Sequence, residues 1–295
     1  MYLSQNPLIS VILPVFNSAQ YISASVQSII NQSFNRLEII IIDDGSSDHS
    51  FEILSAYAKN DSRIHLISRD NRGLIYTLNE AIQAARGEYI ARMDSDDISI
   101  CNRLEKQLNF LQDHQLDICG TFVRLIGAAT GNWKYPVSHK GCEVELLFGV
   151  PFAHPSVMGR SKVFKELRYS FDWPLVEDYD LWQRGWAAGF KMGNVPEVLL
   201  QYRVHRRQTS RFYRREQAQN SQRIRSRHWQ QLLSSRLGLG STEAREAEKD
   251  PWKTFQLLRE LKQCYKGTEA EKILHHALLR LFSHRLQSWI LDRTS

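Results

Sequence analysis

Three carboxylates crowd into four consecutive residues of this 295-residue chain: Asp94, Asp96 and Asp97, in the segment ARMDSDDIS. Carboxylates this close repel one another, so the arrangement is costly unless a cation lies between them. Mg²⁺ and Mn²⁺ prefer oxygen ligands of this kind. The alternative is ordinary turn and helix-capping chemistry, in which such acidic clusters are solvated. The surrounding sequence has to decide between a metal site and a turn.

The acidic cluster follows the last of four short apolar segments, which alternate with amphipathic helical patterns. We predict strands over 8–15, 37–42, 64–67 and 88–93. Such βαβ units build a mostly parallel central sheet with helices on both faces, and right-handed crossovers place the strand carboxyl ends along one edge. Ligands of α/β sheets bind at that edge. We therefore expect an α/β fold with its binding site there.

Polar residues follow three of these strands at the predicted edge. They are Phe16-Asn17, Asp43-Asp44 and Asp94-Ser95-Asp96. The usual phosphate-binding loops are missing, because the sequence has no GxGxxG after the first strand and no GxxxxGK[ST]. A diphosphate then needs another source of positive charge, which a divalent cation shared by Asp94 and Asp96 would provide. The sequence thus predicts a crevice for a metal-bound nucleotide.

At this point the chain resembles a known family, the family-two glycosyltransferases of the GT-A fold. The resemblance lies in four segments, which are ISVILPVFNSAQYISASVQSIINQSF, LEIIIIDDGSSD, NRGLIYTLNEAIQAARGEYIARMDSDD and VEDYDLWQR. It covers about residues 8–205 and is specific, since the motifs keep their order and spacing. The non-processive members are the better match, because the QxxRW motif and the transmembrane helices of processive polysaccharide synthases are missing. The resemblance implies a GT-A catalytic domain over residues 1–205.

The resemblance also implies a nucleotide-binding set. Its members are Pro14, Phe16, Asn17, Asp43, Asp44, Arg72, Gly73, Asp94 and Ser95. Asp44 would accept the N–H of the base with Asp43 in support, and the Arg72-Gly73 turn would close over the base. Asp94 would hold the ribose or metal-bound waters. Phe16 is open to a second interpretation, as a core residue.

The same resemblance implies the metal and catalytic groups. Asp96 would bind Mn²⁺ or Mg²⁺ directly, and His205 would lie near the metal or the diphosphate. Asp178 would deprotonate the acceptor hydroxyl for an inverting, in-line attack at the anomeric carbon. Two alternatives stay open: Glu177-Asp178 as an acidic helix N-terminus, and His205 as a surface histidine. His154 falls in the region where acceptors bind.

The charge distribution divides the chain. The net charge is +6, but residues 201–295 hold 20 basic and 9 acidic residues, which leaves 18 basic and 23 acidic residues in 1–200. We place a boundary near residue 206 and predict a helical, arginine-rich C-terminal extension over 206–295. Its amphipathic stretches at 252–264 and 273–291 either pack onto the catalytic domain or a second subunit, as in a homo-oligomer, or bring arginines to an anionic membrane.

Cysteine usage and the N-terminal sequence indicate the compartment. The four cysteines have no CxxC spacing, so a reducing compartment fits better than a disulfide framework. The first apolar run lacks a basic segment before it and contains a proline, which is typical of a strand and not of a signal peptide. We expect a cytoplasmic protein, with peripheral attachment to the inner face of the plasma membrane through the basic extension.

These observations predict an enzyme that moves a hexose-type sugar from a nucleotide-diphosphate sugar, UDP-sugar first, to a hydroxyl of a saccharide or lipid-linked saccharide. The setting would be synthesis of cell-surface polysaccharide, lipopolysaccharide or capsule. One alternative is a Mg²⁺-dependent phosphotransferase or phosphatase, since DDGSSD follows a strand. The other is nucleic-acid binding by the arginine run. The acidic half would repel phosphate backbones, so we expect no nucleic-acid partner.

Overall fold

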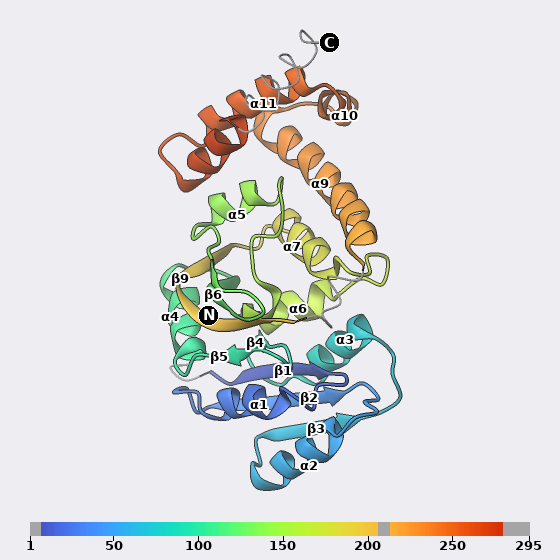
Figure 1. Cartoon of the computed structure of the whole chain (residues 1–295). Coiled ribbons are helices and arrows are strands. Elements are labelled where there is room, and N and C mark those ends of the chain that lie inside the picture. The colour runs from blue at the N-terminus through green and yellow to red at the C-terminus, as the bar shows by residue number, and fades with distance from the viewer. Residues whose placement is uncertain (1–6, 206–212, 280–295) are drawn as a thin grey trace.

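A nine-stranded sheet lies at the centre of the computed structural model, which describes residues 7–205 and 213–279. Its strands follow the order β3-β2-β1-β4-β8-β6-β9-β5, with β7 paired to β6. Figure 1 shows α2 at one end of the molecule and the C-terminal helices at the other. The sheet edge that carries the candidate site lies between these ends.

The first half of the sheet is parallel, as predicted. Its elements are β1 (Ile9–Val15), α1 (Ile22–Ile30), β2 (Leu37–Asp43), α2 (Ser50–Asn60), β3 (Ile64–Ser68), α3 (Leu74–Ala84) and β4 (Tyr89–Arg92). Alternate residues of β1 and β2 pack into two different apolar clusters. Ile39 and Ile41 join the cluster of α1, whereas Ile40 and Ile42 join the cluster of α3. Burial on both faces explains why these strands are continuous apolar runs.

The second half of the sheet is mixed. Its elements are β5 (Ile98–Ser99), α4 (Arg103–Asp113), β6 (Ile118–Gly127), β7 (Gly131–Trp133), α5 (His139–Glu145), η1 (His154–Ser156), β8 (Met158–Arg160), α6 (Ser161–Leu167), α7 (Glu177–Ala187) and β9 (Met192–Val204). β8 runs antiparallel between β4 and β6, and β5 runs antiparallel to β9. The predicted α/β fold is confirmed, with more antiparallel pairing than expected because short β8 bridges the two halves.

The C-terminal extension is helical over its described part. It comprises α9 (Arg214–Leu237), α10 (Ser241–Lys249), α11 (Pro251–Cys264) and a helical stretch at 269–279. The predicted amphipathic stretch at 252–264 is α11, whereas the other, at 273–291, is described only to residue 279. The predicted boundary near 206 lies outside the described residues.

The apolar faces of the extension pack internally. Leu232 of α9 and Leu261 of α11 are fully buried, in one cluster with Val144 and Leu147 of the catalytic part. The carboxylate of Glu269 accepts the backbone N–H groups of Val137 and Ser138 at 2.9 and 2.8 Å. Of the predicted alternatives, packing onto the catalytic part is therefore the one that these described helices show. Across 7–205 and 213–279, the helices are all too short or too polar to cross a bilayer.

Candidate active site

The predicted acidic cluster forms at the carboxyl end of β4. Carboxylate oxygens of Asp94, Asp96 and Asp97 all lie within 4.8 Å of one another. Asp97 is 1% exposed, and one of its oxygens accepts the backbone N–H of Arg203 at 2.8 Å. Its other oxygen is buried without a hydrogen-bond partner among the described residues. A cation is the partner that such an arrangement fits best.

The electrostatics of the cluster agree with this. Burial raises the pKa of Asp94 to about 6, although the buried guanidinium of Arg92 lies 2.6 Å away and favours the charged form. Burial, with Asp94 and Asp96 close by, raises the pKa of Asp97 well above its usual range. The site therefore holds more negative charge than Arg92 offsets. A divalent ion on Asp94 and Asp96 would relieve that repulsion, so the residues present fit a metal.

His205 joins the cluster from the end of β9. Its Nε2 atom lies 2.8 Å from an Asp96 carboxylate oxygen, and the Nε–H of Arg203 donates to the Asp96 carbonyl at 2.8 Å. The imidazole also contacts the ring of Tyr21, with a centroid separation of 5.2 Å. His205 therefore lies against the acidic cluster, and its role near the metal or the diphosphate stays a prediction.

Asp44, the residue predicted to bind the base, organises the following loop. Its carboxylate accepts the backbone N–H groups of Arg72 and Gly73 at 2.8 and 2.9 Å and pairs with the Arg69 guanidinium. Gly73 has φ 84°, in the left-handed region that favours glycine. The Arg72 guanidinium lies 4.8 Å from the Tyr76 ring centroid. Asp44 thus holds the Arg72-Gly73 turn in place.

The other predicted nucleotide-binding residues surround the ends of β1 and β2. Phe16 is 52% exposed, so the core interpretation of this residue is wrong. Asn17 has φ 49° and accepts the Ser47 backbone N–H at 2.8 Å, while Asp43 accepts the Ser68 hydroxyl at 2.9 Å. The hydroxyl groups of Ser95 and Ser18 form a hydrogen bond at 2.6 Å. Pro14 is buried in β1, where it pairs with Ile42 of β2.

Asp178 begins α7 beside a second carboxylate, Glu177. Burial raises the pKa of Asp178, although the Tyr179 backbone N–H donates to its carboxylate at 2.7 Å. Burial and the charge of Asp178 raise the pKa of Glu177 to about 7. The Asp178 charge is also among the smaller influences that raise the pKa of Asp94. A raised pKa of this kind is what a general base needs, and the role of Asp178 as the base stays a prediction.

The C-terminal extension supports the segment before α7. Leu175 has φ 70°, a strained value for a residue other than glycine, and its carbonyl accepts from the Gln217 side chain at 3.1 Å. The Arg227 guanidinium lies 5.4 Å from the Trp173 ring centroid and donates to fully buried Asp180 at 2.7 Å. Helix α9 therefore helps to hold the entry into α7.

Sequence reasoning missed two buried arginines. Arg92 lies within β4, and Arg103 donates to the carbonyls of Arg92 and Pro155, both at 3.1 Å. A charged residue inside the apolar run EYIARM was the available signal for Arg92. His154, expected near the acceptor, bonds the Tyr169 hydroxyl at 2.7 Å, and burial lowers its pKa well below the usual range. His154 is therefore a partly buried histidine whose surroundings favour the neutral imidazole.

Comparison with known proteins identifies the family. The model of glycosyl transferase family 2 matches residues 10–168. An uncharacterized glycosyltransferase of Haemophilus influenzae is 37% identical over 234 residues, which cover 74% of this chain and 72% of that protein. The O-antigen biosynthesis glycosyltransferase WbnJ of Escherichia coli is 36% identical over 212 residues, which cover 69% of this chain and 82% of WbnJ.

Solved structures share the fold. The structure of S. aureus TarS 1-349 in complex with UDP-GlcNAc aligns with a TM-score of 0.61 at 16% identity, covering 88% of this chain and 80% of that one. The mannosyltransferase PcManGT from Pyrobaculum calidifontis, in complex with GDP-Man and Mn²⁺, aligns at 0.57 and 16% identity, covering 97% and 84%. The predicted GT-A fold is confirmed, and the chain belongs to glycosyltransferase family 2.

Proposed function

We propose that this glycosyltransferase is metal-dependent and inverting, and that it transfers a hexose-type sugar from a UDP-sugar to a hydroxyl of a saccharide acceptor. The observation that carries the proposal is the cluster of Asp94, Asp96 and Asp97 within 4.8 Å, with one buried Asp97 oxygen that lacks a partner among the described residues. Asp96 and Asp94 would hold Mn²⁺ or Mg²⁺, with His205 beside Asp96.

The donor would occupy the edge between β1, β2 and β4. Exposed Phe16 offers an apolar ring for the base, and the Asp44-supported turn at Arg72-Gly73 would close over it. UDP-GlcNAc in TarS supports a UDP-sugar, whereas GDP-Man in PcManGT makes the identity of the base a matter for experiment.

The chemistry would need one proton acceptor. The acceptor hydroxyl would give its proton to the Asp178 carboxylate as its oxygen attacks the anomeric carbon, and the bond to the diphosphate oxygen would break on the opposite side. A carboxylate with a raised pKa is a stronger base than an ordinary one. The bound ion would offset negative charge on the departing diphosphate.

The setting follows from the relatives and from charge. WbnJ acts in O-antigen biosynthesis by its description, which supports a saccharide or lipid-linked saccharide acceptor in cell-surface polysaccharide, lipopolysaccharide or capsule synthesis. The enzyme would be cytoplasmic, with its basic extension at the anionic inner face of the plasma membrane. Co-sedimentation with anionic and neutral liposomes tests the attachment. Light scattering tests a homo-oligomer built through the C-terminal helices.

The decisive experiment is a screen of nucleotide sugars with Mn²⁺, Mg²⁺ or EDTA, read out as release of nucleoside diphosphate. We expect metal-dependent release from a UDP-sugar in the wild type and none from Asp96→Ala. Asp113→Ala, an exposed acidic residue of α4, is the matched control and should behave as the wild type. Equal release with and without metal would contradict the metal role. A phosphoenzyme without nucleotide-sugar turnover would favour the phosphotransferase alternative.

A further inference from the structure

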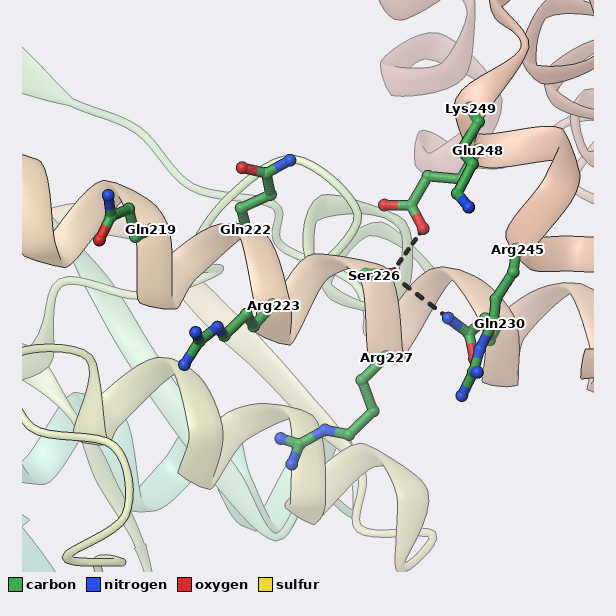
Figure 2. Close-up of a pocket in the computed structure, with 9 residues that line it drawn as sticks. All are labelled: Gln219, Gln222, Arg223, Ser226, Arg227, Gln230, Arg245, Glu248 and Lys249. Carbon is green, nitrogen blue, oxygen red and sulfur yellow. Dashed lines mark hydrogen bonds between the residues drawn. The ribbon is translucent and has the colours of Figure 1, made fainter.

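A groove of about 940 Å³ runs between α9 and α10, outside the candidate active site. Figure 2 shows that its walls come from one long face of α9 and from the end of α10 across from it. The lining includes four basic side chains and one acidic side chain; the basic ones are Arg223, Arg227, Arg245 and Lys249. The groove is therefore a concentrated positive site.

Two of the four basic side chains have protein partners. Arg227 pairs with Asp180, and Arg245 donates to the Gln230 side chain at 3.0 Å. The guanidinium of Arg223 and the ammonium of Lys249 are exposed, and neither has a hydrogen bond or an ion pair within 7–205 and 213–279. The acidic residue of the groove, Glu248, bonds the Ser226 hydroxyl at 2.5 Å. Arg223 and Lys249 remain available for an anion.

The rest of the lining favours a saccharide over other anions. Two side-chain amides, Gln219 and Gln222, offer the paired donors and acceptors that sugar hydroxyls need, whereas Gln230 bonds Arg245 and Ser226. The lining residues include no aromatic side chain on which a nucleic-acid base could stack. They also include no large apolar side chain that could enter a bilayer. A concave, polar and cationic surface fits a flexible anionic glycan.

The groove lies against α7, the helix that carries the proposed base. Arg227, which lines the groove, binds Asp180 on α7 and stacks on Trp173, and the proposed base Asp178 lies on that same helix. Figure 2 shows Arg223 and Arg227 leaving α9 on one side, toward the neighbouring helices of the catalytic part. One helix, α7, thus contacts the groove through Asp180 and carries Asp178.

We propose that the α9–α10 groove binds the extended part of an anionic saccharide acceptor, with Arg223 and Lys249 on its carboxylate or phosphate groups. The inference rests on the proposed function only for the statement that this saccharide is the acceptor. Binding itself needs neither metal nor donor sugar. Guanidinium and ammonium groups bind such anions by charge-assisted hydrogen bonds that weaken as salt rises.

The test is calorimetric binding of a galacturonic acid hexasaccharide to the full chain, without metal or nucleotide. We expect the double variant Arg223→Gln/Lys249→Gln to raise Kd by about tenfold or more at low salt. The matched control Arg259→Gln/Lys266→Gln removes the same charge from exposed residues of the extension that do not line this groove. It should keep Kd within about twofold.

The other arms use maltohexaose, phosphatidylglycerol vesicles and a single-stranded oligonucleotide. Equal Kd values for the two double variants, or no hexasaccharide binding to the wild type, would overturn the proposal. So would groove-dependent binding of the vesicles or the oligonucleotide without binding of the hexasaccharide. Neutral maltohexaose should bind more weakly than the charged sugar. If the wild type bound the hexasaccharide but turned over no nucleotide sugar, the proposed function would be refuted and the groove proposal would stand.

Discussion

The Nε2 atom of His205 lies 2.8 Å from an Asp96 carboxylate oxygen, although 109 residues separate the two in sequence. Antiparallel pairing of β5 with β9 creates this contact, since Ile98 and Ser99 pair with Gln201 and Leu200. The strand that leaves the acidic cluster and the strand that ends at the histidine are thus hydrogen-bonded to each other. The metal-binding residues of a site can be assembled in this way from distant segments.

Replacing His205 with alanine should weaken Mn²⁺-dependent UDP binding by about tenfold, because the imidazole orients or supplements the Asp96 carboxylate. Calorimetry with Mn²⁺ and with EDTA measures the effect. His114→Ala is the matched control, since this exposed histidine directly follows α4 and its ring nitrogen contacts the Phe110 carbonyl. If the loss in affinity is the same in EDTA, His205 acts on the nucleotide site and not through the metal.

Asp178→Asn should lower kcat for sugar transfer by about 10²–10⁴-fold, since the amide cannot accept the hydroxyl proton. UDP affinity should change by less than about twofold, because the substitution leaves the groups at the ends of β1 and β2 intact. Steady-state kinetics and calorimetry give the two values. Asp172→Asn, an exposed residue just before α7, controls for charge. Transfer at a near wild-type rate would assign Asp178 to the helix end and place the base elsewhere.

Glu177 predicts a pH dependence of stability. Its pKa is raised from 4.5 to about 7 in the folded chain, so the folded state binds more protons between these values. The contribution of Glu177 to folding stability therefore falls as pH rises through this window. The Glu177→Gln variant lacks this titration. Its unfolding free energy minus that of the wild type should therefore rise by on the order of 1–3 kcal/mol from pH 4.5 to pH 7.5.

Urea unfolding at the two pH values tests this, with exposed Glu166→Gln as control. A difference between Glu177→Gln and wild type that stays constant with pH would show that Glu177 titrates normally in the folded protein.

The first half of the fold was predictable because its signals are local. Each of β1, β2 and β4 is a mostly apolar, buried run, and the polar residues that follow fall at one edge by topology alone. β8 has only three residues, and it is stabilised by pairing with strands that are distant in sequence. The mixed second half could not be read from residue patterns for that reason.

Residue patterns indicated which side chains lie at this end of the strands, but not which partners those side chains contact. Asp44 was expected to bind the base, yet its carboxylate accepts two N–H groups from residues 28 and 29 positions away. Arg92, which pairs with Asp94, gave only the weak signal of one charge in an apolar strand. Such contacts depend on which loops the fold brings together, and residue spacing does not encode them.

The predicted boundary near residue 206 separates an acidic part of the sequence from a basic part. It does not separate two hydrophobic cores as clearly. Glu143 of α5 is fully buried, and its carboxylate accepts from Arg236 of α9 at 2.6 Å and from Trp186 at 3.0 Å. Arg236→Met removes the ion pair of that carboxylate. The Arg236 side chain is 42% exposed, so water reaches the pair, and we expect a loss of about 1–3 kcal/mol, less than for a fully buried pair.

Urea unfolding of the full chain should show this loss for Arg236→Met, and the double variant Glu143→Gln/Arg236→Met should recover part of it, since the buried charge is gone. Arg259→Met, an exposed residue of α11, is the control. A single unfolding transition that moves with Arg236→Met would mean that the extension and the catalytic part unfold together. Two separate transitions, of which Arg236→Met shifts only the one at lower urea concentration, would indicate that the boundary near 206 divides two independent folding units.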